Sequence, residues 1–199
     1  QQIASAFAGD IGVTSSLYPE PNCTQVQKEC LEAIRNPKPE LRPEMWDAIT
    51  HWTLSLEVPA QRNKTKPEVK RGEQLFADSG CGGCHVSELR TSKYEPVPAL
   101  SNKTIRPFTD LLLHDMGPDL ADGRPDFKAS GSDWRTPPLW GIGLSKQVNA
   151  STSFLHDGRA RNLTEAIVWH GGEAKPAKDK FVAMPQAKRN DLLEFLNSL

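Results

Sequence analysis

The 199-residue sequence has little net charge and no long apolar run. Its 24 lysines and arginines nearly balance 25 acidic residues, giving a formal charge of −1 at pH 7. Balanced charge gives no sign of the basic surface that nucleic acids and anionic membranes require. No stretch approaches the roughly 20 apolar residues of a membrane-spanning helix, and the first residues lack the basic and then apolar pattern of a secretory signal. We therefore expect no nucleic-acid partner and no membrane span.

Hydrophobic residues are also scarce. They make up 37% of the chain, while 16 prolines place much of it in connections. A chain of this length holds one domain plus an extension. We expect an N-terminal helical extension over residues 1–62, a polar linker over 60–66 and a compact domain over 67–199. A large apolar cofactor would complete the modest core of that domain.

Cysteine is rare and occurs in two pairs. Cys23 and Cys30 lie in a turn-rich stretch with no histidine nearby. In an oxidising compartment this spacing predicts a local disulfide, with two unrelated thiols as the alternative.

The other pair belongs to Cys81-Gly82-Gly83-Cys84-His85, a C-x-x-C-H motif. Two thiols at this spacing can each add to a haem vinyl group, and the adjoining histidine becomes the proximal iron ligand. The competing interpretations are a redox dithiol, which needs a βαβ setting, and half a zinc site, which needs a second ligand pair. Neither setting is visible in the sequence. The motif predicts one covalently attached haem c and a function in electron transfer.

Helical periodicity predicts a mainly α fold. A helix over Pro67–Ala77 places Val69, Gly72 and Phe76 on one face, and a helix over Gln186–Leu199 places four leucines on one side, namely Leu192, Leu193, Leu196 and Leu199. A helix leading into the haem motif and paired with a later helix is the frame of class I cytochromes c. Gly72 would allow these two helices to approach closely.

Further elements are expected on both sides of this frame. The extension should hold a short helix over 24–35 and a second helix beginning at Pro43. Pro-rich loops over 91–107 and 117–138 should wrap a large cofactor, separated by a short helix at Leu111–Leu113. A well-capped helix runs from Asn162 to His170.

Several residues are candidates for the sixth iron ligand. In the capped helix, Leu163, Ala166, Ile167 and His170 follow helical spacing, which places His170 on the apolar stripe and makes it the first candidate. Met116 and Met184 are the alternatives, the first beside the leucine run and the second in a Met-Pro pair before the last helix. The remaining histidines and methionine are weaker candidates: His51, His114, His156 and Met45.

Several stretches resemble a known family. Three are similar to the C-terminal haem domain of bacterial di-haem cytochrome c peroxidases and of the related di-haem enzyme of methylamine utilisation, namely Trp134–Trp140, Phe154–Ile167 and Leu192–Leu199. Three more are typical of the branch called di-haem oxidoreductases or thiol oxidoreductases, namely Ala8–Ser16, Asn22–Thr24 and Asp110–Leu120. The resemblance covers nearly the whole chain.

The resemblance implies a ligand set. In that superfamily the distal ligand of the C-terminal haem follows the His-Asp-Gly motif by one short helix, and it is methionine or tyrosine. The corresponding residue here is His170, which implies a bis-histidine haem of lower potential than a His/Met haem. The resemblance also implies cofactor contacts from Arg135, Pro137, Arg159 and Arg161. His156 and Asp157 would hold the loop.

The resemblance also implies a larger enzyme. Relatives carry two haems, of which the C-terminal one relays electrons and the N-terminal one reacts with substrate, whereas this sequence has one C-x-x-C-H. We expect an N-terminal haem domain in the same polypeptide, a redox donor protein and a periplasmic location. Relatives also hold an interdomain calcium ion, for which this sequence shows no site. The alternatives are a free-standing monohaem cytochrome c carrier and a haem-free dithiol or metal-binding module.

Overall fold

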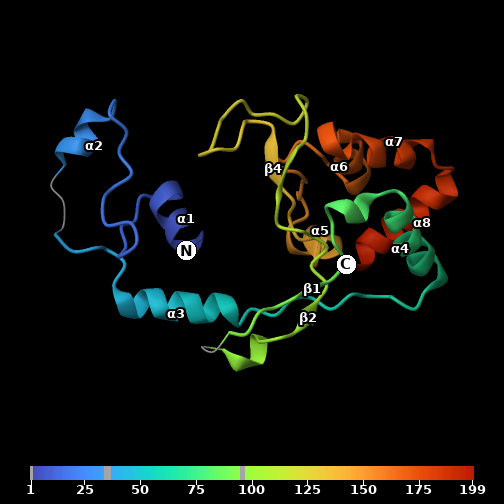
Figure 1. Cartoon of the computed structure of the whole chain (residues 1–199), viewed down its shortest axis with the longest axis horizontal. Helices are drawn as coiled ribbons and strands as arrows, with labels where there is room; N and C mark the ends of the chain where they lie inside the picture. Colours follow the sequence, from blue (N-terminus) through green and yellow to red (C-terminus); the bar gives the residue numbers. More distant parts are fainter. Residues whose placement is uncertain (1, 34–36, 95–96) are drawn as a thin grey trace. The chain divides into compact units, whose positions relative to one another are not determined.

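A computed structural model describes residues 2–33, 37–94 and 97–199 (Figure 1). The chain forms two compact units, Gln1–Glu57 and Val58–Leu199. Helices account for 43% of the residues and strands for 7%, which confirms the mainly α prediction. Among the described residues, no helix has both the length and the apolar character needed to cross a membrane.

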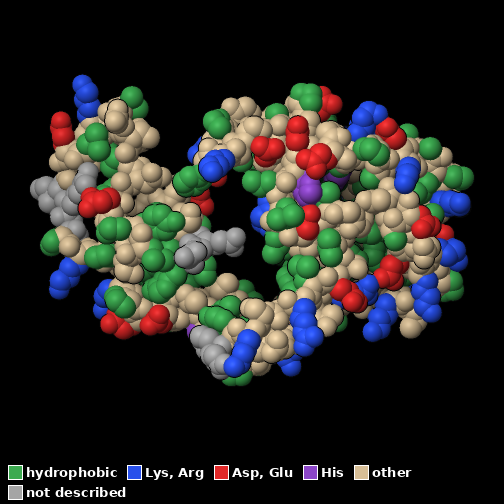
Figure 2. Space-filling model, in the orientation of Figure 1, with side chains coloured by type: hydrophobic (Ala, Val, Ile, Leu, Met, Phe, Trp, Pro, Cys, Tyr) green, Lys and Arg blue, Asp and Glu red, His purple; other side chains and the backbone are tan. Residues whose placement is uncertain are grey.

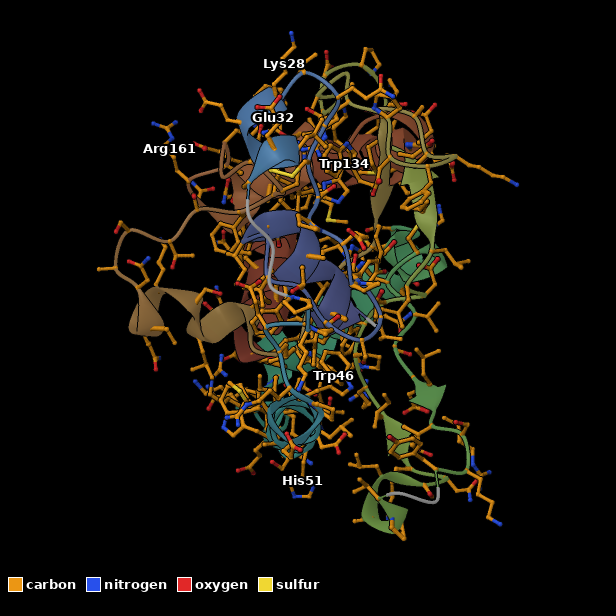
Figure 3. The ribbon with its side chains drawn as sticks, turned by 90° about the vertical axis from the view of Figure 1, so that its left-hand side faces the viewer. Lys28, Glu32, Trp46, His51, Trp134 and Arg161 are labelled. Atoms are coloured by element: carbon orange, nitrogen blue, oxygen red, sulfur yellow. A yellow bond between two sulfur atoms is a disulfide. The ribbon has the colours of Figure 1, made fainter. Side chains whose placement is uncertain are left out.

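Within its described residues, the first unit contains three helices, α1 (Gln2–Asp10), α2 (Lys28–Glu32) and α3 (Pro43–Leu54). Helix α3 begins at Pro43 as predicted, because proline at the first helical position loses no backbone hydrogen bond. Helix α2, from which Lys28 and Glu32 extend (Figure 3), is shorter than the predicted 24–35, and part of that range lies outside the described residues. The Cys23–Cys30 disulfide is present, as predicted. Helix α1 was not predicted.

The core of the second unit is the contact between α4 (Pro67–Asp78) and α8 (Gln186–Ser198). Both predicted helices are confirmed, and Val69, Gly72 and Phe76 of α4 are buried. The ring of Phe76 lies 5.4 Å from that of Phe195 on α8 and 6.1 Å from that of Phe108. At the rim, the Arg71 guanidinium donates to both carboxylate oxygens of Asp191, at 2.7 and 2.9 Å. The helix pair is therefore fixed by edge-on aromatic packing and a bidentate ion pair.

Gly72 is where the two helices come closest. A Cβ added there would lie 2.7 Å from the Cβ of Phe195 and would overlap the carbonyl oxygen of Asp191. We predict that Gly72→Ala lowers the free energy of unfolding by about 1–3 kcal/mol, because the helices must separate. Chemical denaturation measures this value. Gly9→Ala is the matched control, since an added Cβ at that helical glycine meets nothing within 4 Å; equal stability of both variants would contradict the close contact.

Short elements connect α4 to α6. The 3-10 turn η1 (Cys81–Gly83) follows α4, strand β1 (Leu89–Arg90) pairs with β2 (Thr104–Ile105), and β3 (Leu113–Asp115) pairs with β4 (Asp133–Arg135). The turns η2 (Pro98–Leu100) and η3 (Ile142–Leu144) and helix α5 (Ser145–Val148) complete the connection. Most of 91–107 and 117–138 is irregular, as the prolines predict.

The predicted helix at Leu111–Leu113 is wrong. Leu111 has a φ of 61°, and the Leu112 amide donates to the Asp110 carboxylate at 2.9 Å, so the chain turns and enters β3 opposite Arg135. The three leucine residues are 52–60% exposed, and they offer no buried stripe on which a helix could pack. An apolar run without helical periodicity is ambiguous between helix and strand, and here strand pairing prevails.

Three elements precede α8. They are α6 (Leu163–Trp169), η4 (Gly172–Ala174) and α7 (Lys175–Ala183). Helix α6 confirms the prediction over 162–170, because the Asn162 side chain accepts a hydrogen bond from the Glu165 amide at 2.9 Å as an N-cap. Helix α7 was not predicted; it begins with Pro176 in its first turn and buries only Phe181.

Candidate cofactor site

The C-x-x-C-H motif forms a tight turn at the end of α4. Gly80 adopts a φ of 90°, which favours glycine, and the His85 amide donates to the Cys81 carbonyl at 2.9 Å. Cys81 and Cys84 are half-buried and carry free thiols, unlike the bonded pair Cys23–Cys30. Both thiols and the histidine are thus presented from one short segment whose conformation α4 fixes.

The surroundings of the two thiols disfavour a redox dithiol. Burial raises the pKa of Cys81 to about 11, and burial followed by the charge of Asp110 raises the pKa of Cys84. A redox dithiol works through a lowered thiol pKa, because the thiolate is the reactive form.

The His85 ring is oriented by one backbone contact. Its Nδ1 lies 2.9 Å from the carbonyl oxygen of Phe108, a buried core residue. Because a carbonyl only accepts, Nδ1 carries the proton and Nε2 keeps a free lone pair. Burial and, to a smaller extent, nearby His170 lower the pKa of His85 to about 4, although the Phe108 hydrogen bond acts in the opposite direction. His85 is a neutral, oriented imidazole of the kind that metal sites use.

His170 has the same local arrangement. It caps the C-terminus of α6, and its Nδ1 lies 2.7 Å from the Ala166 carbonyl oxygen, which leaves Nε2 free. Burial lowers the pKa of His170, with the Ala166 hydrogen bond opposing and the charge of Lys178 adding to the decrease. Leu163 and Ala166 on the same stripe are buried, as the helical spacing predicts. The structure thus places two neutral imidazoles within electrostatic reach of each other, and neither Nε2 has a hydrogen-bond partner among the described residues.

The other candidate ligands have different surroundings. Met184 ends α7 and packs against the hydrophobic core. Met116 is half-buried, and its carbonyl lies against Gly171. The ring of His156 stacks on that of Trp134 with centroids 3.4 Å apart. His51 and Met45 lie on α3 in the first unit.

His114 sits between two carboxylates. Its Nε2 is 2.8 Å from Asp110 Oδ2 and its Nδ1 is 2.9 Å from Glu173 Oε2, and these two hydrogen bonds raise the pKa of His114. The Cys84 sulfur, an Asp110 oxygen and a His114 nitrogen lie within 4.8 Å of one another, a spacing that a metal ion could use. Both ring nitrogens already face carboxylates, so an ion pair is the better description of this cluster.

The predicted cofactor-contacting cations differ in their surroundings. Arg159 donates to the Asp157 carboxylate at 2.6 Å and to the Asp119 carbonyl, and its guanidinium lies 4.8 Å from the ring centre of Trp169, next to His170. Arg135 on β4 and Pro137 after it are exposed. Arg161 extends outward (Figure 3), 84% exposed and paired with Glu165 at 2.6 Å. Of these predicted cations, Arg159 alone lies against a residue that adjoins His170.

Comparison with known proteins supplies the family. The family model described as "Di-haem oxidoreductase, putative peroxidase" matches residues 1–199. The chain belongs to this family. Searches of curated proteins and of solved structures found no match. Membership in the di-haem oxidoreductases gives the chain a haem-based, peroxidase-like oxidoreductase role and haem as its cofactor, and it confirms the resemblance drawn from the motifs.

Sequence reasoning missed the groups that orient the two imidazoles in this di-haem oxidoreductase. The carbonyls of Phe108 and Ala166 belong to the backbone, so no residue type in the sequence marks them. The Ala166 carbonyl could have been found, because a histidine at a helix end can reach the carbonyl four residues before it. The pairing of His114 with Glu173 joins residues 59 positions apart, and no pattern in the sequence predicts it. Asp110 and His114, four residues apart, would be neighbours on the helix expected at 111–113, but they meet through a turn and strand β3 instead.

Proposed function

We propose that this di-haem oxidoreductase chain holds one c-type haem through Cys81 and Cys84, with His85 and His170 as its axial ligands, and relays electrons through it. One observation carries the proposal. Two neighbouring, half-buried imidazoles each donate Nδ1–H to a backbone carbonyl and keep Nε2 free. Free Nε2 atoms beside two unpaired thiols are the donors that a covalent bis-histidine haem needs.

Each residue contributes a defined part to this role. The haem, when bound, supplies reversible one-electron transfer. Cys81 and Cys84 fix it to the turn after α4, while burial keeps His85 and His170 neutral and therefore able to bind iron. Arg159, beside Trp169, is the proposed partner of a haem propionate. With His85 and His170 both holding the haem, the iron would have no ligand position left for peroxide, so we propose relay rather than substrate turnover here.

The second haem of the family would bind elsewhere. This sequence contains one C-x-x-C-H, and we place the substrate-reacting haem in an N-terminal domain of the same polypeptide, supplied with electrons by a donor protein. The Cys23–Cys30 disulfide supports an exported, periplasmic setting, because such bonds persist in oxidising compartments. The first unit, residues 1–57, would belong to the region between the two haem domains, where relatives hold calcium.

The test is production of the chain with a haem-maturation system. We expect a Soret band, a mass increase of one haem per chain that survives denaturation, and a low-spin ferric spectrum without a methionine–iron charge-transfer band. A chain that emerges without haem, with both thiols free, would reject the proposal and favour a dithiol module. A methionine–iron band would retain the haem and reject His170 in favour of Met116 or Met184.

A further inference from the structure

An ion-pair network crosses the second unit between the cofactor-attachment turn and the segment after His170. His114 lies at its centre, with Asp110 on one side and Glu173 on the other, at 2.8 and 2.9 Å. Carboxylate oxygens only accept, so both ring nitrogens of His114 carry hydrogen and the ring is an imidazolium. Figure 2 shows histidine side chains bordered by acidic ones on this unit. His114 and Asp110 are only 16% and 12% exposed, so their attraction is weakly screened.

Each end of the network is fixed to one side of the candidate site. The Asp110 amide donates to the carbonyl of Cys84 at 2.9 Å, next to His85. At the other end, one Glu173 oxygen accepts from His114 and the other accepts from the Asp115 amide at 3.0 Å. Glu173 follows His170 by three residues, so the network spans from one proposed ligand segment to the other.

The two segments also touch through their backbones. A Cβ at Gly171 would lie 2.6 Å from the Met116 carbonyl oxygen, and one at Gly172 would lie 2.7 Å from the Gly117 nitrogen. Gly172 has a φ of 48°, which favours glycine. Two glycines directly after His170 therefore let its chain press against the strand that carries His114, and this contact brings Glu173 to the imidazolium.

We propose that His114, held between Asp110 and Glu173, positions His170 as the sixth ligand by tying the segment after α6 to the attachment turn. His170 ends its helix, and only its Nδ1 contact with Ala166 orients the ring from within α6. The backbone beyond it, which sets the ring's distance from His85, is fixed by the network. The inference rests on the proposed function, and it makes His114 a positioning residue rather than a ligand.

The test measures how readily an added ligand replaces the sixth ligand. Ferric haem-loaded His114→Phe and Glu173→Gln are mixed with cyanide, and the rate of cyanide binding is compared with that of wild type. Cyanide can bind only while the sixth ligand is dissociated, and loss of a hydrogen bond between charged groups shifts that dissociation equilibrium about tenfold or more. We therefore expect the observed binding rate to rise about tenfold in both variants. Asp179→Asn is the matched control, because it removes another carboxylate that pairs with a cation, Lys175 at 2.5 Å, in the helix that follows η4.

The outcomes separate the two proposals. Wild-type cyanide kinetics in folded His114→Phe and Glu173→Gln, with His170→Ala five-coordinate, would overturn the positioning role and leave the ligand assignment intact. An unchanged spectrum in His170→Ala would overturn the ligand assignment itself. If His114→Phe does not fold, Glu173→Gln decides, since its shape is conserved and only its charge is lost. Acceleration in Asp179→Asn as large as in the network variants would also overturn the proposal.

Discussion

The double variant Cys81→Ala/Cys84→Ala should contain no covalently bound haem when it is made with a haem-maturation system. Both thiols lie on the turn that α4 presents, and each is unpaired in the structure. A thioether bond can form at no other free cysteine, because Cys23 and Cys30 are bonded to each other. Denaturing mass spectrometry and the pyridine haemochrome spectrum measure the expected complete loss.

Single variants and a second pair refine this result. Cys81→Ala or Cys84→Ala should each keep one thioether bond, whose haemochrome absorbs at a longer wavelength than that of the doubly linked haem. Cys23→Ser/Cys30→Ser removes the other cysteine pair, in the first unit, and should keep a full complement of haem. Haem that remained attached in Cys81→Ala/Cys84→Ala after acid–acetone extraction would show that another residue forms the link.

His170→Ala should change the haem from six-coordinate low-spin to five-coordinate high-spin. The variant removes the only imidazole that Ala166 orients, while Leu163 and Ala166 keep α6 anchored in the core. We expect nearly complete conversion of the ferric spectrum, measured by absorption and electron paramagnetic resonance. Added imidazole should restore the low-spin form by occupying the cavity.

Three further variants make the assignment specific. Met116→Leu and Met184→Leu should leave the spectrum unchanged, and either one that converts it would identify the true ligand. His170→Met should keep six coordination and raise the reduction potential, because methionine ligation stabilises the reduced iron. A potential equal to that of wild type would mean that residue 170 does not touch the iron.

Local signals in the sequence were sufficient to predict the helices that frame the site. Gly72 and the apolar positions around it predicted the α4–α8 contact, because a glycine within a helical stripe has few other uses. Asn162 and Glu165 predicted the start of α6, since capping depends on residues three apart. Residues close together in the chain determine these features.

Features set by contacts between distant residues could not be predicted. Leu111–Leu113 became turn and strand because of Asp110 and the pairing of Leu113 with Arg135, 22 positions away. The orientation of His85 depends on a backbone carbonyl 23 residues further on. Helix α7 has one buried apolar side chain, and its stability comes from packing rather than from a periodic pattern. The motifs predicted the candidate ligands His85 and His170, whereas only the fold reveals the backbone groups that orient them.

The contact between α4 and α8 also bears on the maturation of the haem that we propose. Joining these helices closes a loop of roughly a hundred residues, and the entropy cost of closing so long a loop slows the formation of contacts this distant in sequence. Until α8 has been synthesised and has docked on Gly72, the turn that carries Cys81 and Cys84 remains at the end of an uncovered helix. An attachment enzyme would therefore meet an accessible, partly folded substrate, and the last helix would close the unit only after the cofactor had been secured.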